Sequence, residues 1–344
     1  MAETRQRASQ DSGRVSVGAR VVTLILLGLA VHLLLPQLAA LERSAQVLRT
    51  MSPWLVGLAF AAQALSYLSS GYLLAALVRS TGDRLSLARG TMVFTAASTI
   101  GLIGGGPVGN VAATYRWLSR SGVSASGAAL AGWVPTLFYN AALVGVGIFG
   151  LSHLLLGGQL STLELVGFGF TLLVLLLGVA LAVWGARHRP QLIGGVDRLA
   201  RVWDRLRRRR HDPGGVAAGV GRVIEGWEML RRGGWRGPAA AALLNTGFDM
   251  LTLYLFFAAA GHAVGLGLLL TGYGLPLLLG RISFLPGGVG VVEGTMAAVY
   301  ASLGIPASVT VVVTLAYRLV SFWLPLVLGL PIIAYLDRRT PQPT

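Results

Sequence analysis

Long apolar stretches separated by short polar connections make up most of this chain. Six stretches are long enough to cross the hydrocarbon core of a bilayer as a helix, which takes about 20 residues. They are residues 20–41, 54–78, 126–155, 162–185, 238–260 and 307–336. None of them alternates polar and apolar positions as a membrane β-strand does, so the pattern predicts an all-α polytopic membrane protein with six spanning helices.

Two further apolar stretches, residues 87–108 and 264–285, run into glycine-rich breaks. The first break reads Gly101-Leu-Ile-Gly-Gly-Gly-Pro-Val-Gly109 and the second reads Leu285-Pro-Gly-Gly-Val-Gly290. Glycine and proline interrupt helices, because glycine adds backbone freedom and proline removes a hydrogen-bond donor. Each stretch therefore predicts a glycine-broken, re-entrant helical hairpin that returns to the side from which it entered.

Arginine placement predicts the orientation. Residues 186–237 hold 13 arginines and are expected to remain cytoplasmic, whereas residues 157–161 hold none and can be translocated. Counting crossings from there, region 87–125 begins and ends in the cytoplasm, and region 264–306 begins and ends outside. Both termini are then cytoplasmic, and we expect a multi-pass protein of the bacterial cytoplasmic (inner) membrane.

The same pattern predicts the domain organisation. A disordered cytoplasmic tail, a single transmembrane domain with a basic amphipathic loop, and a second tail are expected at residues 1–19, 20–336 (with the loop at 186–237) and 337–344. The motifs Gly104-Gly-Gly-Pro107 and Pro286-Gly-Gly-Val289 precede Ala-Ser pairs at the same spacing. This correspondence predicts an inverted-topology repeat of residues 54–155 and 238–336.

Composition removes several function classes. Hydrophobic residues make up 54% of the chain and charged residues 12%, which a soluble domain could not sustain without large exposed apolar patches. The net charge of +15 lies in loops, so we expect no nucleic-acid partner. The run Arg207, Arg208, Arg209 and Arg210 is expected to contact anionic leaflet lipids, although these arginines could serve orientation alone.

The chemistry of an enzyme is not evident in the sequence. There is no cysteine, and the five histidines show no metal-ligand spacing. No nucleophile stands beside a base, and no nucleotide-binding motif follows a strand. We therefore expect no metal, no cofactor and no catalysis.

The glycine breaks are candidate binding elements. A helix that follows a break presents free N–H groups and the positive end of its dipole, which favours phosphate or carboxylate. Gly105, Gly106, Gly287 and Gly288 are the candidate residues at the two tips, which we expect to meet inside the bundle. The alternative is that the glycines only let helices pack closely.

Charged residues near the second break strengthen the binding interpretation. Arg281 and Glu293 bracket it, and Arg318 lies inside the final span. A charge at the bilayer centre costs at least a few kcal/mol, so these groups should be paired or face water. Glu293 could cap its own helix, pair with Arg318 or Arg281, or receive a cationic headgroup. A purely structural ion pair is the alternative.

Two more polar positions are candidates. Asp249 lies four residues after Asn245, so both share a helix face that must look into the bundle. Asp249 is a candidate for proton coupling or for pairing with an arginine. Arg116 follows the first break by a few turns and could bind a headgroup or anchor the helix at the interface.

The segment Leu285-Pro-Gly-Gly-Val-Gly-Val-Val-Glu293, followed by Ala316-Tyr-Arg318, resembles the lysylphosphatidylglycerol synthase transmembrane family. The likeness is to the flippase part of the multiple peptide resistance factor proteins, without the cytosolic synthase domain, and it spans nearly the whole chain. In the first repeat, the family often has an acidic residue after the glycines and then an arginine, and Asn110 stands near the acidic position and Arg116 near the basic one. The resemblance implies lipid translocation, and some relatives dimerise.

These observations predict an integral membrane lipid translocase, or flippase. It would bind the headgroup of a phospholipid or polyprenyl-linked lipid in an intramembrane polar cavity formed by the two tips and the charged residues named above. An ion-coupled secondary transporter of a small anionic solute is the alternative, with Asp249 or Glu293 carrying the proton.

Overall fold

The structure, a computed structural model, describes residues 41–156, 234–283 and 285–339, with isolated positions between 169 and 221. Within these ranges every regular element is a helix, which confirms the predicted all-α class. The predicted tail 1–19 lies outside the described residues. The predicted spans 20–41 and 162–185 and the basic loop 186–237 also lie almost wholly outside them.

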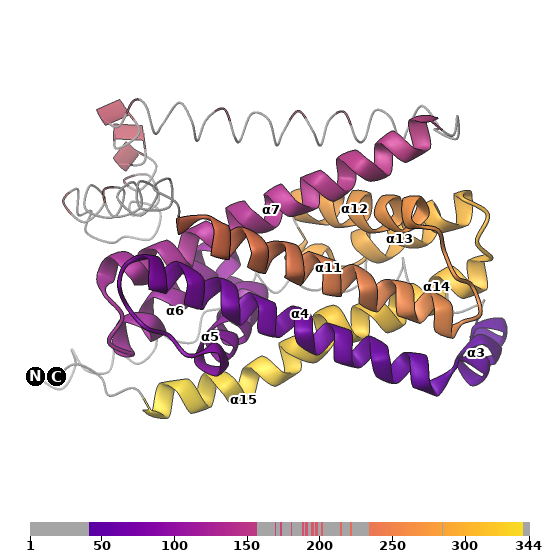
Figure 1. The fold of residues 1–344 in the computed structure, drawn as a ribbon, viewed down its shortest axis with the longest axis horizontal. Coiled ribbons are helices and arrows are strands. Elements are labelled where there is room, and N and C mark those ends of the chain that lie inside the picture. Colours follow the sequence, from indigo (N-terminus) through magenta and orange to yellow (C-terminus); the bar gives the residue numbers. More distant parts are fainter. Residues whose placement is uncertain are drawn as a thin grey trace, which may run out of the picture.

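Ten α-helices are defined in the described ranges, and three short turns connect some of them (Figure 1). The helices are α3 (Leu41–Thr50), α4 (Pro53–Ser80), α5 (Leu87–Ile100), α6 (Gly106–Arg120), α7 (Ala125–Leu156), α11 (Arg236–Ala259), α12 (Leu266–Ile282), α13 (Val291–Ser302), α14 (Ala307–Arg318) and α15 (Leu324–Arg339). The turns are the π-helical η2 (Gly101–Gly105), the 3-10 turn η4 (Pro286–Gly288) and the π-helical η5 (Leu319–Trp323).

Four helical segments in the described part of the chain are long and apolar enough to cross a membrane. They are Pro53–Ser80, Ala125–Gly150, Arg236–Ala259 and Ala307–Arg338. Each coincides with one of the predicted spans, and the last runs through α14, η5 and α15 without leaving a helical path. The large apolar side chains exposed on these helices, such as Phe149, Leu243 and Val327, are placed to face lipid.

The two glycine breaks separate helices that pack against each other. Helix α5 contacts α6 beyond η2, and α12 contacts α13 beyond η4, so each predicted hairpin is a pair of helices joined at a broken tip. The chain turns at the tips through positive φ, for example 55° at Gly106 and 63° at Gly287. A side chain is strained there, which explains the glycines.

The hairpins lie toward opposite ends of the long helices, and their tips meet (Figure 1). Turn η2 contacts η4, and a Cβ added to Gly287 would come within 3.1 Å of Leu102 Cδ2. The meeting of the tips, predicted from the need to shield broken backbone from lipid, is therefore present. Membrane entry of the hairpins and the inverted repeat stay predictions.

Each hairpin has its own hydrophobic core. Trp117 and Leu118 of α6 are buried with the second half of α4, the start of α7 and Leu336 of α15. Tyr300 and Met296 of α13 are buried with α12, α14 and the second half of α11. Two cores therefore flank the point where the tips meet.

Helix α5 approaches α4 closely because glycines face each other at the crossing. A Cβ on Gly90 would lie 2.5 Å from the carbonyl oxygen of Gly71. A Cβ on Gly71 would lie 2.6 Å from the backbone nitrogen of Thr91, which cannot turn aside. Small residues that bring helix backbones together are typical of membrane bundles.

We expect Gly71→Ala to destabilise the protein by about 1–3 kcal/mol, because the added methyl group forces α5 away from α4. Gly57→Ala on the same helix is the matched control, since nothing lies within 4 Å of its Cβ. Thermal unfolding of the detergent-purified variants measures both effects. Equal melting temperatures for the two variants would contradict the close crossing.

The connection between α4 and α5 fastens the start of α7 through Asp83. The Ser124 backbone N–H donates to Asp83 Oδ2 at 3.0 Å, and the Ser124 and Thr81 hydroxyls donate to the same oxygen. These hydrogen bonds, chiefly those from Ser124, lower the pKa of the Asp83 carboxyl below its usual value. The ionised Asp83 carboxylate thus holds the first turn of α7 in place.

A lowered pKa in the folded state means that the stabilisation is complete above the ordinary carboxyl pKa of about 4. It is lost as the pH falls through the lowered folded value. We expect Asp83→Asn to reduce thermal stability at pH 7, and the deficit to shrink below about pH 4. Melting temperatures of both proteins across this range check the prediction, and parallel curves would refute it.

Candidate functional site

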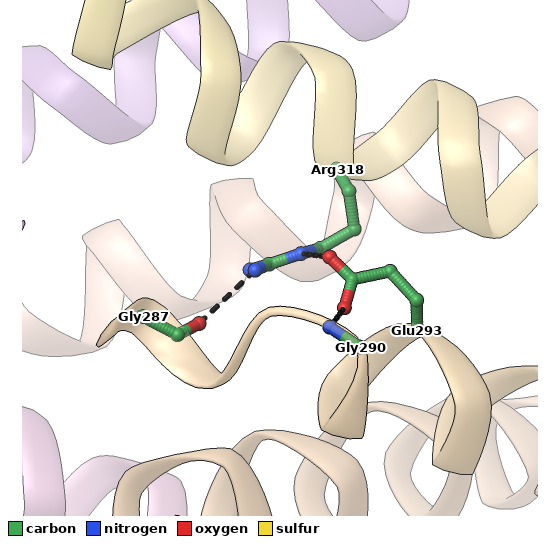
Figure 2. A network of polar contacts seen from close by, with 4 residues as sticks. All are labelled: Gly287, Gly290, Glu293 and Arg318. Carbon is green, nitrogen blue, oxygen red and sulfur yellow. Dashed lines mark hydrogen bonds and ion pairs between the residues drawn. The ribbon is translucent and has the colours of Figure 1, made fainter. Parts of the chain in front are cut away.

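A buried ion pair joins α14 to the tip of the second hairpin (Figure 2). Arg318 Nε donates to Glu293 Oε1 at 2.6 Å, and both side chains are 6% exposed. A second guanidinium nitrogen of Arg318 donates to the carbonyl oxygen of Gly287 at 3.0 Å. The guanidinium also lies over the Phe322 ring, 4.3 Å from its centroid. Arg318 therefore binds both ends of the broken tip.

The sequence around Glu293 explains its position. Gly290 has φ 82°, which lets the chain turn into α13 directly after the tip. Glu293 is the third residue of α13, and its Oε2 accepts the Gly290 N–H at 2.7 Å. The carboxylate thus caps its own helix and pairs with Arg318 at the same time, so two of the predicted alternatives hold together.

Close contact explains why Gly287 carries no side chain. An added Cβ would collide with the Phe322 ring, and the carbonyl oxygen of Gly287 must face Arg318. Gly288 is also at positive φ, and its Cβ would come within 2.7 Å of the Gly280 backbone. The second tip is therefore shaped by backbone that lies directly against neighbouring helices.

A second polar cluster surrounds Asp249 in the middle of α11. Gln63 Nε2 donates to Asp249 Oδ1 at 2.9 Å. The hydroxyls of Tyr273 and Tyr317 donate to Asp249 Oδ2 at 2.8 and 2.5 Å. Gln63 and both tyrosines are buried. The predicted arginine partner is not what the structure shows, because the hydrogen bonds to this carboxylate come from neutral groups of α4, α12 and α14.

Asn245 lies one turn before Asp249 and faces α4 as well, as its spacing predicted. Its amide nitrogen donates to the backbone oxygen and hydroxyl of Ser66 at 2.9 and 2.8 Å, and to the Ser70 hydroxyl at 3.0 Å. Helices α4 and α11 are thus joined by a polar seam whose α4 side chains are buried and whose α11 side chains are half-buried. Such hydrogen bonds fix the register of two membrane helices.

Arg281, at the end of α12, differs from Arg318. Its side chain is exposed, and its hydrogen bond to another described residue goes to the neutral Asn140 Oδ1 at 2.8 Å. Within the described ranges no carboxylate lies at ion-pair distance from it. Arg281 therefore keeps most of its donors available at the level of the second tip.

Arg116 is not brought to these groups. It pairs with Asp337 at 2.6 Å, with both side chains more than 40% exposed, near the end of α15. It also lies about 15 Å along α6 from Gly106, the start of the helix after the first tip. Gly105 and Gly106 are at that tip, where η2 contacts η4. The structure thus groups Arg281, Glu293, Arg318, Asp249 and the tip glycines, and leaves Arg116 apart.

Several residues of this region were not predicted from the sequence. Gln63, Tyr273, Tyr317 and Tyr67 were missed, and Asn140 was not chosen as a site residue. Gln63 had a usable signal, because an amide in the middle of an apolar span needs a partner. The tyrosines gave no such signal, since they also suit interfaces and cores.

The buried ion pair should behave as one unit. We expect Glu293→Gln and Arg318→Met each to destabilise the protein by about 3–5 kcal/mol, because each leaves an unpaired buried charge. The double variant should lose less than the sum of the two. Reversible unfolding in mixed detergent and SDS measures this double-mutant cycle, and additive losses would show that the two side chains do not interact.

Comparisons with known proteins agree with this architecture. A sequence model described as "Lysylphosphatidylglycerol synthase TM region" matches residues 23–329. A "UPF0104 membrane protein" of Methanothermobacter thermautotrophicus is 36% identical over 87 residues, which is 25% of this chain and 26% of that protein. One of Methanocaldococcus jannaschii is 38% identical over 82 residues, 24% of each chain.

A relative from Pyrococcus horikoshii is 32% identical over 83 residues, 24% of this chain and 25% of that protein. The chain thus matches about a quarter of the length of these archaeal relatives. The family model, in contrast, covers nearly the whole chain. This chain is a multi-pass membrane protein that belongs to the lysylphosphatidylglycerol synthase transmembrane-region family.

Proposed function

We propose that this protein is a lipid translocase that binds an anionic phospholipid or polyprenyl-linked headgroup beside the two meeting tips. The lipid tails remain in the bilayer while the headgroup crosses. The observation that carries this proposal is the exposure and the hydrogen bonding of Arg281. It is an exposed guanidinium at the level of the broken helices, hydrogen-bonded to a neutral amide among the described residues.

A charge at this depth is costly unless water or a ligand meets it. Arginine suits phosphate because its planar fork donates to two oxygens at once. An incoming phosphate would give acceptors to the guanidinium donors of Arg281 that Asn140 does not occupy.

The Glu293–Arg318 pair has a different role in this proposal. Both charges are already satisfied, and Arg318 also holds the Gly287 carbonyl. The pair keeps the tip in one shape so that Arg281 stays beside the path of the headgroup. We therefore assign headgroup contact to Arg281 and positioning to Glu293 and Arg318.

The orientation follows from the arginines at the base of the first hairpin. Arg79, Arg84, Arg89 and Arg120 lie at this end with Arg338. The other end has fewer arginines: Arg43 and Arg49 in α3, and none in the turns Gly261–Gly265 and Leu303–Pro306. The positive-inside rule then directs the first hairpin toward the cytoplasm. A headgroup from the cytoplasmic leaflet would approach the tips along the first hairpin, and one from the outer leaflet would approach them along the second.

We expect Arg281→Gln to slow the movement of a fluorescent anionic phospholipid in proteoliposomes by about ten- to a hundredfold. This is the effect of losing one charge-assisted hydrogen-bonded contact, about 1.5–3 kcal/mol. Folding should be preserved, because no ion pair is broken. Chemical quenching of the outer-leaflet fluorophore measures the rate.

Arg84→Gln, at an exposed position between α4 and α5, is the control and should leave the rate unchanged. Wild-type movement in folded Arg281→Gln would remove Arg281 from the headgroup path. Uptake of a soluble anion without lipid movement would instead support the small-anion transporter.

A further inference from the structure

The Asp249 cluster takes no part in headgroup binding as proposed above, yet it joins a half-buried carboxylate to three buried polar side chains. Three neutral donors surround the carboxylate: the Gln63 amide, the Tyr273 hydroxyl and the Tyr317 hydroxyl. Tyr67 of α4 lies nearby, and the charges of Arg318 and Arg281 act on the cluster without a hydrogen bond to it. These are the titratable and charged groups that face Asp249 from α4, α12 and α14.

One acceptor in this cluster lacks a partner. Gln63 is 2% exposed, and its Oε1 has no hydrogen bond among the described residues while its Nε2 donates to Asp249. A buried polar atom without a partner calls for an explanation, such as a ligand or a second state. Protonation of Asp249 gives a second arrangement of the same groups, in which Gln63 Oε1 can accept a hydrogen bond.

The hydrogen bonds can be counted in both states. When Asp249 is ionised, Oδ1 accepts from Gln63 and Oδ2 accepts from both tyrosines, and Gln63 Oε1 is left over. When Oδ1 carries a proton, it becomes a donor, and a half-turn of the Gln63 amide brings Oε1 to face it. The amide nitrogen is then left over in its place. Each state leaves one atom unpartnered, and the tyrosines keep their bonds in both.

Protonation of Asp249 changes the net charge of the group of ionisable side chains near the second tip. Asp249 and Glu293 balance Arg318 and Arg281, so this group of four is neutral when all are ionised. A proton on Asp249 leaves a net charge of +1, which favours an anion at the open Arg281. By linkage, an anion at Arg281 favours the proton on Asp249 to the same extent.

We infer that Asp249 is a proton-binding site that is loaded together with the anionic headgroup. Hydronium gives its proton to Oδ1 and leaves as water, and release reverses the same step. The inference rests on the proposed lipid-translocase function and adds its coupling ion. One proton would accompany each anionic headgroup.

The path from this site to the tip runs through α14. Tyr317 binds Asp249, and the next residue, Arg318, binds Glu293 and the tip carbonyl. The Tyr67 hydroxyl lies within hydrogen-bonding distance of the Val320 and Ser321 carbonyls, at 2.7 and 2.9 Å, in the π-helical turn η5. Hydrogen bonds to an ionised acceptor are stronger than those to a neutral one. Neutralising Asp249 therefore weakens its hydrogen bond with Tyr317, which lies two residues before η5. Such π-helical irregularities are often found at functional sites.

Infrared difference spectroscopy during a pH jump tests the site without any transport. A carboxylic-acid C=O band should appear on acidification of the wild-type protein in detergent and be absent in Asp249→Asn. Asp337→Asn, which removes an exposed carboxylate, is the matched control and should keep the band. A Tyr273→Phe variant, which retains the carboxylate but loses one donor, should keep the band and shift its frequency. A band that persists unchanged in Asp249→Asn would overturn the assignment.

The coupling is tested by calorimetry with a short-chain anionic phospholipid. The wild-type dissociation constant should rise with pH between the titration of the free protein and that of the lipid-bound protein, by at most about tenfold per pH unit for one linked proton, and level off above it. Asp249→Asn, which mimics the protonated form, should bind with no such dependence. Equal pH dependence in both proteins would refute the linkage.

The two tests also separate this inference from the proposed function. An Asp249 band without lipid binding would uphold the proton site and contradict the lipid translocase. Lipid binding without an Asp249 band would uphold headgroup binding and overturn the proton site.

Discussion

Backbone hydrogen bonding at the two glycine tips is the constraint on which the rest of this structure depends. A helix that breaks inside a bilayer exposes N–H and C=O groups that lipid cannot satisfy. Here the second tip is satisfied by side chains from the adjoining helices, with Arg318 on the Gly287 carbonyl and Glu293 on the Gly290 N–H. The first tip packs against it. The burial of an ion pair follows from this need.

The two arginines near the second tip illustrate how burial and pairing divide structural from binding roles. Arg318 is enclosed and has a carboxylate, a carbonyl and an aromatic ring as partners. Arg281 is exposed and contacts an amide. Removing Arg318 would leave Glu293 as an unpaired buried charge. Removing Arg281 would take away a guanidinium whose hydrogen bond goes to a neutral amide. The same residue type therefore stabilises the tip in one place and is the proposed headgroup contact in the other.

The polar seam between α4 and α11 connects these features. It begins with Asn245 against Ser66 and Ser70 and ends with Asp249 against Gln63. Tyr273 and Tyr317 extend it to α12 and α14, the helices that carry Arg281 and Arg318. The hydrogen bonds of Asp249 thus reach the two helices that adjoin the second tip.

The sequence by itself determined the helical class, the four long spans within the described ranges and the positions of both breaks. Hydrophobic length and glycine content are local properties, and local properties are enough for these predictions. It also determined that Asn245 and Asp249 share a face, because helical spacing fixes the direction of side chains.

Tertiary structure alone decided which groups meet. The sequence left Glu293 with Arg281, Arg318 or its own helix end as partners, and the packing of α14 against the tip selected the last two. It also set Arg116 apart from the other candidates, against Asp337. Contacts between residues far apart in the chain depend on how helices cross, and the hydropathy of each helix carries no record of its neighbour.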